Sequence, residues 1–188
     1  MILGAFRNRR CAGRSAPRRS ADIGTVAMPL VNRVRPRLGD VVEITTPRGF
    51  AYAQFTHKHD APPRYGALIR VLPGLFINRP SEFATLVSGP SSFMTFFPLG
   101  AACHRGIVKV VANEVVPPHA STFPTFRSSV KVGPGKRGGP WYLWDGTREW
   151  RVDSLTDAEL RKYPPRGIWN DTLLIERILE GWSHEKDT

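Results

Sequence analysis

Alternating apolar and polar positions dominate the chain from residue 39 onward and predict mostly β structure. Runs rich in aromatic and β-branched residues have the length and spacing of strands; they lie at 40–46, 50–56, 67–76, 92–99, 106–116 and 125–132. Thr46-Pro47-Arg48-Gly49 has the residue order of a type I turn, so the first two runs form a hairpin. Residues 57–66 are expected to be loop, and residues 81–87 either a short helix capped by Ser81 or an edge strand.

The segment WYLWDGTREWRV, residues 141–152, predicts a further hairpin that holds three of the five tryptophans. A two-residue Asp145-Gly146 loop opposes Trp144 to Thr147 and Trp141 to Trp150. Opposed residues share a face, so one face carries Trp141, Leu143, Trp150 and Val152, and the other carries Tyr142, Trp144, Thr147, Glu149 and Arg151. We expect the first face to be core, which leaves Tyr142 and Trp144 as candidates for a contact surface. The hairpin is expected to pair with 125–132 across the glycine-rich loop 133–139.

The pattern becomes helical after Val152. Ser154 or Thr156 can cap a short helix, with Asp157 or Glu159 completing a capping box. A second helix is expected to begin after Asn170 and to end before Gly181, with an apolar stripe of Leu174, Ile175, Ile178 and Leu179 that packs on the sheet. The predicted fold is therefore mostly β (α+β), a twisted antiparallel sheet or partly open barrel with short C-terminal helices.

Charge divides the chain into a basic tail and a nearly balanced body. Of the net charge of +11, residues 1–38 contribute +8 through nine arginines and one aspartate, whereas residues 39–188 carry 18 basic and 15 acidic residues. The tail shows little periodicity and is expected to lie outside the fold as an unstructured arm, sequence upstream of a start at Met28, or an import signal. Residues 39–188 are then one domain.

Composition also bears on compartment. Two cysteines, Cys11 and Cys103, cannot form a zinc site by themselves, and their small number suits a reducing cytoplasm. The longest apolar stretch, 91–103, is interrupted by Pro98 and Gly100 and is shorter than the roughly 20 residues of a membrane span. We therefore expect a soluble cytoplasmic protein without a membrane partner.

Few residue groups suggest chemistry. His57 and His59 are the densest potential metal ligands, but a zinc site needs further ligands, so a solvated loop is the preferred interpretation. Cys103-His104 is expected to lie in a strand, whose neighbours point to opposite faces, which argues against a catalytic pair. The loop 133–139 lacks the Ser or Thr of a Walker motif. Glu43 and Glu114 have no second acid or base that the sequence places beside them. No catalytic residue, metal site or cofactor is therefore predicted.

From Gly39 onward the order of features resembles the immunity protein 26 family of bacterial polymorphic toxin systems. The resemblance rests on GDVVEITTPRGFAYAQF at 39–55, on the tryptophan hairpin at 141–152 and on PPRGIWNDTLLIERILEGW at 164–182. It covers roughly residues 38–182 and implies a mostly β domain that binds and neutralises a cognate toxin without catalysis.

Interface centres favour Trp, Tyr and Arg. On that basis the candidate partner-binding residues are Tyr142, Trp144, Arg148, Arg151, Tyr65 and Arg64. Two alternatives remain open. One is a nucleic-acid-binding module that uses the arginine-rich arm, with sheet aromatics stacking on bases, and the other is a small hydrolase whose site the sequence does not reveal.

Overall fold

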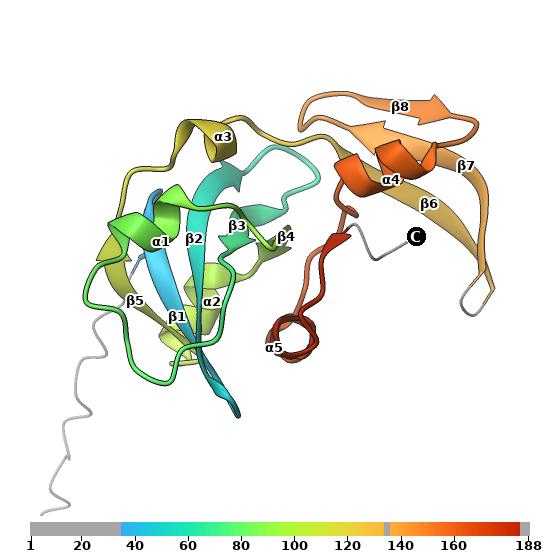
Figure 1. The fold of residues 1–188 in the computed structure, drawn as a ribbon. Coiled ribbons are helices and arrows are strands. Elements are labelled where there is room, and N and C mark those ends of the chain that lie inside the picture. The colour runs from blue at the N-terminus through green and yellow to red at the C-terminus, as the bar shows by residue number, and fades with distance from the viewer. Residues whose placement is uncertain (1–34, 134–135, 185–188) are drawn as a thin grey trace, which may run out of the picture. The chain divides into compact units, whose positions relative to one another are not determined.

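The computed structural model describes residues 35–133 and 136–184. The predicted tail and the alternative start at Met28 lie outside this range, except for the last four tail residues. The described part confirms the predicted fold class, because it consists of two antiparallel sheets and short helices (Figure 1). The larger sheet is open, since its end strands do not pair with each other among the described residues.

The larger sheet has five strands in the order β4-β3-β2-β1-β5. Its strands are β1 (Asp40–Thr46), β2 (Gly49–His59), β3 (Gly66–Val71), β4 (Phe93–Phe97) and β5 (Val108–Asn113). The smaller sheet has the order β6-β7-β8 and contains β6 (Phe126–Gly133), β7 (Lys136–Trp144) and β8 (Glu149–Val152). The helices are α1 (Ala84–Ser88), α2 (Leu99–His104), α3 (Pro118–Ser121), α4 (Asp157–Lys162) and α5 (Asp171–Leu179).

Both faces of the five-stranded sheet are buried, which explains why its strands are apolar at successive positions. On one face Val42, Ile44 and Phe55 pack with α2 and with Leu174 and Ile178 of α5. On the other face Val41 and Tyr52 pack with Phe83 and Val87 at α1. The predicted packing of the C-terminal helix on the sheet is thus confirmed.

Local signals placed the last two helices correctly. Thr156 caps α4 and forms a capping box with Glu159, and Asn170 caps α5 by accepting from the Leu173 amide. Residues 84–88 form a helix, which decides between the two alternatives for 81–87, although its N-cap is Phe83 rather than Ser81. Helices α2 and α3 were not predicted.

Two loop predictions were wrong. Strand β2 continues through His59, which pairs with Gly66 of β3, so residues 57–59 are strand rather than loop. The connection between β6 and β7 is also shorter than predicted, because Gly133 pairs with Lys136, and only residues 134–135 between the two strands lie outside the described part.

The tryptophan hairpin forms in a register two residues away from the predicted one. Trp144 pairs with Glu149 and Trp141 with Val152, so the loop has four residues. The Asp145 side chain explains this loop, because it accepts hydrogen bonds from the amides of Thr147 (2.9 Å) and Arg148 (2.8 Å). Strand side chains alternate with a period of two, so this shift preserves the two sets of facing residues.

Residues 164–169, here called the strap, connect the two sheets. Pro165 forms a parallel bridge to Arg127 of β6, and Ile168 forms one to Phe96 of β4. The Arg127 amide donates to the Pro164 carbonyl (2.9 Å), and the Trp169 amide donates to the Phe96 carbonyl (2.9 Å). The strap thus lies along the edge of one sheet and then along the edge of the other.

Candidate functional site

The predicted burial of the tryptophan hairpin was wrong for Trp144 and Trp150, although Leu143 is buried as predicted. Trp144 is 5 % exposed and belongs to the core, whereas Trp150 is 37 % exposed. The Trp144 ring lies 4.8 Å from the ring of His59 and 5.0 Å from that of Tyr65. Trp144 also packs with Leu68, Phe96 and Phe126, so its face of the hairpin covers the five-stranded sheet. Trp144 is therefore a core residue and not part of an exposed contact surface.

The six predicted contact residues do not form one exposed patch, and Tyr65 packs against the buried Trp144. Tyr142 is half-buried and pairs across the hairpin with Arg151, whose guanidinium contacts Asp153 at 3.4 Å. Arg148 is exposed and lies over Trp150, 5.8 Å from its ring centre. Arg64 and Tyr65 instead line a cavity of about 480 Å³ beside β3 and α2.

The histidines of β2 are structural neighbours of the aromatic core. His57 Nε2 lies 2.9 Å from the Ser121 carbonyl and His59 Nε2 lies 3.0 Å from the Gly146 carbonyl. Because a carbonyl only accepts, both rings must carry a proton on Nε2. No group of three or more potential metal ligands occurs among the described residues.

The remaining sequence candidates have structural surroundings that differ from the prediction. Cys103 and His104 lie in helix α2 rather than in a strand. The pKa of the half-buried Cys103 thiol is raised, mainly by burial and secondly by the negative charge of Asp40. Glu114 contributes its backbone carbonyl, which accepts from Gln54 Nε2 (2.8 Å).

Glu43 is a buried carboxylate with fixed partners. Arg79 donates to both of its oxygens at 2.7 Å, and the Tyr52 hydroxyl donates to Oε2 at 3.1 Å. The Arg79 hydrogen bonds hold the pKa of Glu43 below its ordinary value, against the effect of burial. Burial, together with the neighbouring carboxylate, raises the pKa of Tyr52 to about 12. This arrangement anchors the loop after β3 to the sheet.

A cavity of about 320 Å³, here called the β6 groove, combines tryptophans with arginines. It lies where β6 meets the strap and α5. Its lining residues are Arg127, Ser128, Ser129, Trp141, Pro165, Arg166, Trp169, Leu173, Arg177 and Trp182. None of these described lining residues is acidic.

Each groove arginine lies over a tryptophan ring. The distances from guanidinium carbon to ring centre are 5.6 Å for Arg127 and Trp141, 5.4 Å for Arg166 and Trp144, and 5.8 Å for Arg177 and Trp182. Such stacking holds the planar guanidinium in place while its edge stays able to donate hydrogen bonds. Arg166 and Arg177 therefore present oriented cationic donors beside aromatic surface, whereas the Arg127 guanidinium is buried and donates to carbonyls of this chain.

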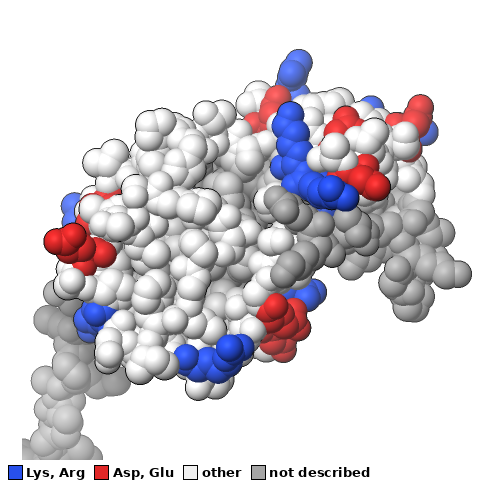
Figure 2. Space-filling model, in the orientation of Figure 1, with Lys and Arg blue, Asp and Glu red and all other residues white. Residues whose placement is uncertain are grey.

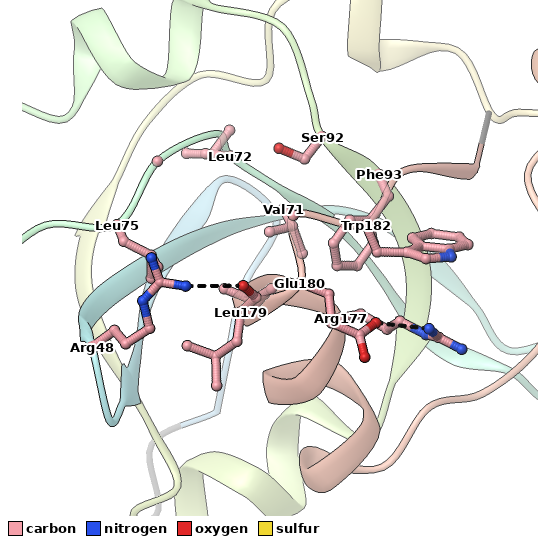
Figure 3. Close-up of a pocket in the computed structure, with 13 residues that line it drawn as sticks. Arg48, Val71, Leu72, Leu75, Ser92, Phe93, Arg177, Leu179, Glu180 and Trp182 are labelled. Carbon is pink, nitrogen blue, oxygen red and sulfur yellow. Dashed lines mark hydrogen bonds and ion pairs between the residues drawn. The ribbon is translucent and has the colours of Figure 1, made fainter. Parts of the chain in front are cut away.

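A second cavity of about 400 Å³ adjoins the groove at Arg177 and Trp182 (Figure 3). Arg48 donates to the carbonyl of Leu179 (3.2 Å) near the end of α5, a hydrogen bond that a dashed line marks in Figure 3. Arg177 contacts Glu180 at 2.8 Å on the other side. The C-terminal turn of α5 thus separates two hollows.

Charged side chains are unevenly distributed on the surface. Figure 2 shows few of them over α1 and the neighbouring loops, whereas both signs occur near α4 and β8. Residues 83–104, which include α1, β4 and α2, contain no Lys, Arg, Asp or Glu.

The chain has no significant match to a protein-family model, to a curated protein or to a solved structure. Among the described residues, no helix is long and apolar enough to cross a membrane.

Sequence reasoning missed the groove because its walls come from distant segments. Trp169 and Trp182 lie outside the tryptophan hairpin, and their rings meet at 5.1 Å only after the strap and α5 have folded onto the sheets. The available signal was the concentration of tryptophan and arginine in residues 164–182, which was interpreted only as a helical end.

Proposed function

We propose that this chain binds a partner protein through the β6 groove. The observation that carries the proposal is the set of three tryptophans and three arginines that line one cavity. Trp and Arg are the residue types most enriched where interfaces concentrate their binding energy. A hollow beside these residues provides a pocket that a partner side chain can fill.

We further propose that the partner is a bacterial toxin, which the chain neutralises without catalysis. This part rests on the resemblance to the immunity protein 26 family at 39–55, 141–152 and 164–182. In the first of these segments, Gly39 has a φ of +89°, and a Cβ there would lie 2.6 Å from the Glu114 carbonyl oxygen. Glycine is thus required at the start of the β1–β2 hairpin.

Six of the ten lining residues of the groove lie in the third segment of the resemblance. The strap provides Pro165, Arg166 and Trp169, α5 provides Leu173 and Arg177, and Trp182 follows the end of α5. The proposed binding site therefore depends on the same residues that suggest the family.

The test measures binding of the full chain to the toxin encoded beside its gene, by isothermal titration calorimetry, together with protection of cells that express that toxin. Arg177→Glu should weaken the complex at least tenfold, or about 1.4 kcal/mol, because it reverses a charge in the groove. Arg161→Glu on exposed α4 is the matched control and should change Kd less than about twofold.

Two results would refute the proposal. One is the absence of binding and protection by the wild-type chain. The other is salt-sensitive binding of a DNA or RNA oligonucleotide that is tighter than any binding of the toxin at about 0.15 M salt, which would favour the nucleic-acid alternative.

A further inference from the structure

We infer that the β6 groove receives an extended acidic peptide segment, which adds to the open edge of β6 at Ser129. The inference rests on the proposed function and specifies the part of the partner that is recognised. It follows from the hydrogen-bonding pattern of β6, from the direction of the strap and from the charge of the groove.

The alternation along β6 directs the backbone N–H and C=O groups of Ser129 away from β7. In an antiparallel pair, successive residues direct their N–H and C=O groups alternately toward and away from the partner strand. The outward backbone groups of Arg127 are hydrogen-bonded to the strap: its amide donates to the Pro164 carbonyl, and its carbonyl accepts from the Arg166 amide (2.7 Å). Ser129, two residues later, pairs with Trp141 in the same continuous register, which shifts only after Ser129, so alternation gives it the same outward orientation.

The strap leaves β6 before it reaches Ser129. Gly167 follows the last hydrogen bond to β6, and its carbonyl lies 3.5 Å from the Thr95 hydroxyl of β4. Among the described residues, the strap makes no backbone hydrogen bond to Ser129. Within the described part of the chain, the strand edge is therefore open where Ser128 and Ser129 line the groove. Such an edge is a template for another strand.

The charge of the groove selects an acidic strand. Arg166 and Arg177 already bind carboxylates of this chain, Glu149 and Glu180, whose side chains are 42 % and 58 % exposed. Ion pairs with exposed carboxylates contribute little free energy. A carboxylate of the incoming segment can therefore replace either of them and keep the guanidinium over its tryptophan ring.

A peptide suits this edge better than a nucleic acid does. Ser129 offers one backbone donor and one backbone acceptor, and a peptide backbone supplies both complementary groups. A phosphodiester backbone supplies acceptors only and leaves the Ser129 carbonyl without a donor. Alternate residues of an extended peptide share one side, so carboxylates two residues apart can face the arginines together.

The test uses the full chain and the peptide acetyl-Val-Glu-Val-Glu-Val-amide, with binding followed by tryptophan fluorescence. The peptide acetyl-Val-Lys-Val-Lys-Val-amide should bind at least about tenfold more weakly, because it reverses the charge. Ser129→Pro removes the outward N–H from an edge position and should weaken acidic-peptide binding about tenfold. Ser129→Ala keeps that N–H and should change Kd less than about twofold. Thermal melts of both variants check that the fold persists.

The outcomes separate this inference from the proposed function. Equal binding of both peptides, or no binding of either, overturns the acidic segment. Equal binding of the acidic peptide by Ser129→Pro and Ser129→Ala overturns the strand addition. If the wild-type chain binds the toxin, equal toxin binding by these two variants overturns it as well. If the acidic peptide binds as expected while the toxin does not bind, the proposed toxin partner is wrong and the peptide site stands.

Discussion

Replacing Trp144 by alanine is expected to destabilise the protein much more than replacing Trp150. Trp144 is 5 % exposed, whereas Trp150 is 37 % exposed. The Trp144 ring meets five other rings at centre distances from 4.8 to 6.0 Å, those of His59, Tyr65, Phe96, Phe123 and Phe126. The change to alanine would leave a cavity between the two sheets.

The size of the effect follows from the buried area. A tryptophan buries roughly 150–250 Å², which at about 25 cal/mol per Å² corresponds to an upper limit of roughly 4–6 kcal/mol. Partial collapse of the cavity lowers this, so Trp144→Ala should cost about 3–5 kcal/mol of unfolding free energy. Trp150→Ala leaves no cavity, because water fills the space of the exposed ring. That change should therefore cost only about 1–2 kcal/mol of unfolding free energy.

Equilibrium urea unfolding of the full chain, followed by circular dichroism, measures both values. The wild-type slope against urea must be retained in the variants for the free energies to be comparable. Equal losses, or a larger loss for Trp150→Ala, would contradict the assignment of Trp144 to the core.

Three further changes test other parts of the fold. Glu43→Gln should cost about 1–2 kcal/mol of unfolding free energy at pH 7. Because Arg79 lowers the folded-state pKa of Glu43, the wild-type stabilisation exists above the unfolded-state pKa and is lost as pH falls through the folded-state pKa. In urea titrations between pH 7 and pH 3, the unfolding free energy of the variant should therefore depend less on pH than that of the wild type. Thr156→Ala should cost about 1 kcal/mol in the same assay by removing the cap of α4, whereas Ser154→Ala should be nearly neutral. Gly49→Ala should lower Tm more than Gly66→Ala, since both have positive φ but only the Cβ at Gly49 meets a backbone atom, the Phe76 carbonyl oxygen at 2.5 Å.

Local signals in the sequence were sufficient for much of the fold. The caps Thr156 and Asn170 act within one turn of their helices, and the Thr46–Gly49 turn joins neighbouring strands. These interactions join residues close in the chain, so their residue order alone predicts them. The apolar runs similarly predicted strands, because both faces of the larger sheet are covered.

The face assignment of the tryptophan hairpin failed because it depends on distant partners. Both faces carry large aromatic side chains, and alternation separates them without showing which one meets the larger sheet. The decision comes from Phe96, Tyr65 and His59, which lie 48 to 85 residues before Trp144 in the chain and form its pocket.

The burial of two arginines was also not predictable from the sequence. A charged residue in an alternating strand is typical of a solvent-facing position, yet Arg70 of β3 is 0 % exposed and Arg127 of β6 is 2 % exposed. Burial of a charge is costly unless hydrogen bonds replace the lost water. Arg70 donates to Gln54 Oε1 (3.0 Å) and to the carbonyls of Val87 and Gly89 at the end of α1.

Arg127 repeats this arrangement at the groove, with a consequence for binding. Its Nε donates to the carbonyls of Leu160 and Tyr163, at 3.2 and 2.8 Å, where the C-terminal end of α4 attracts positive charge. The wall formed by Arg127 and Trp141 is thereby fixed before any ligand arrives, whereas Arg166 and Arg177 at the rim hold carboxylates that a ligand can replace. A fixed wall reduces the entropy lost on binding. We therefore expect charge reversal at Arg177 to act mainly on the affinity for the acidic segment, and removal of the Arg127 guanidinium to act on stability and affinity together, because it also frees the end of α4.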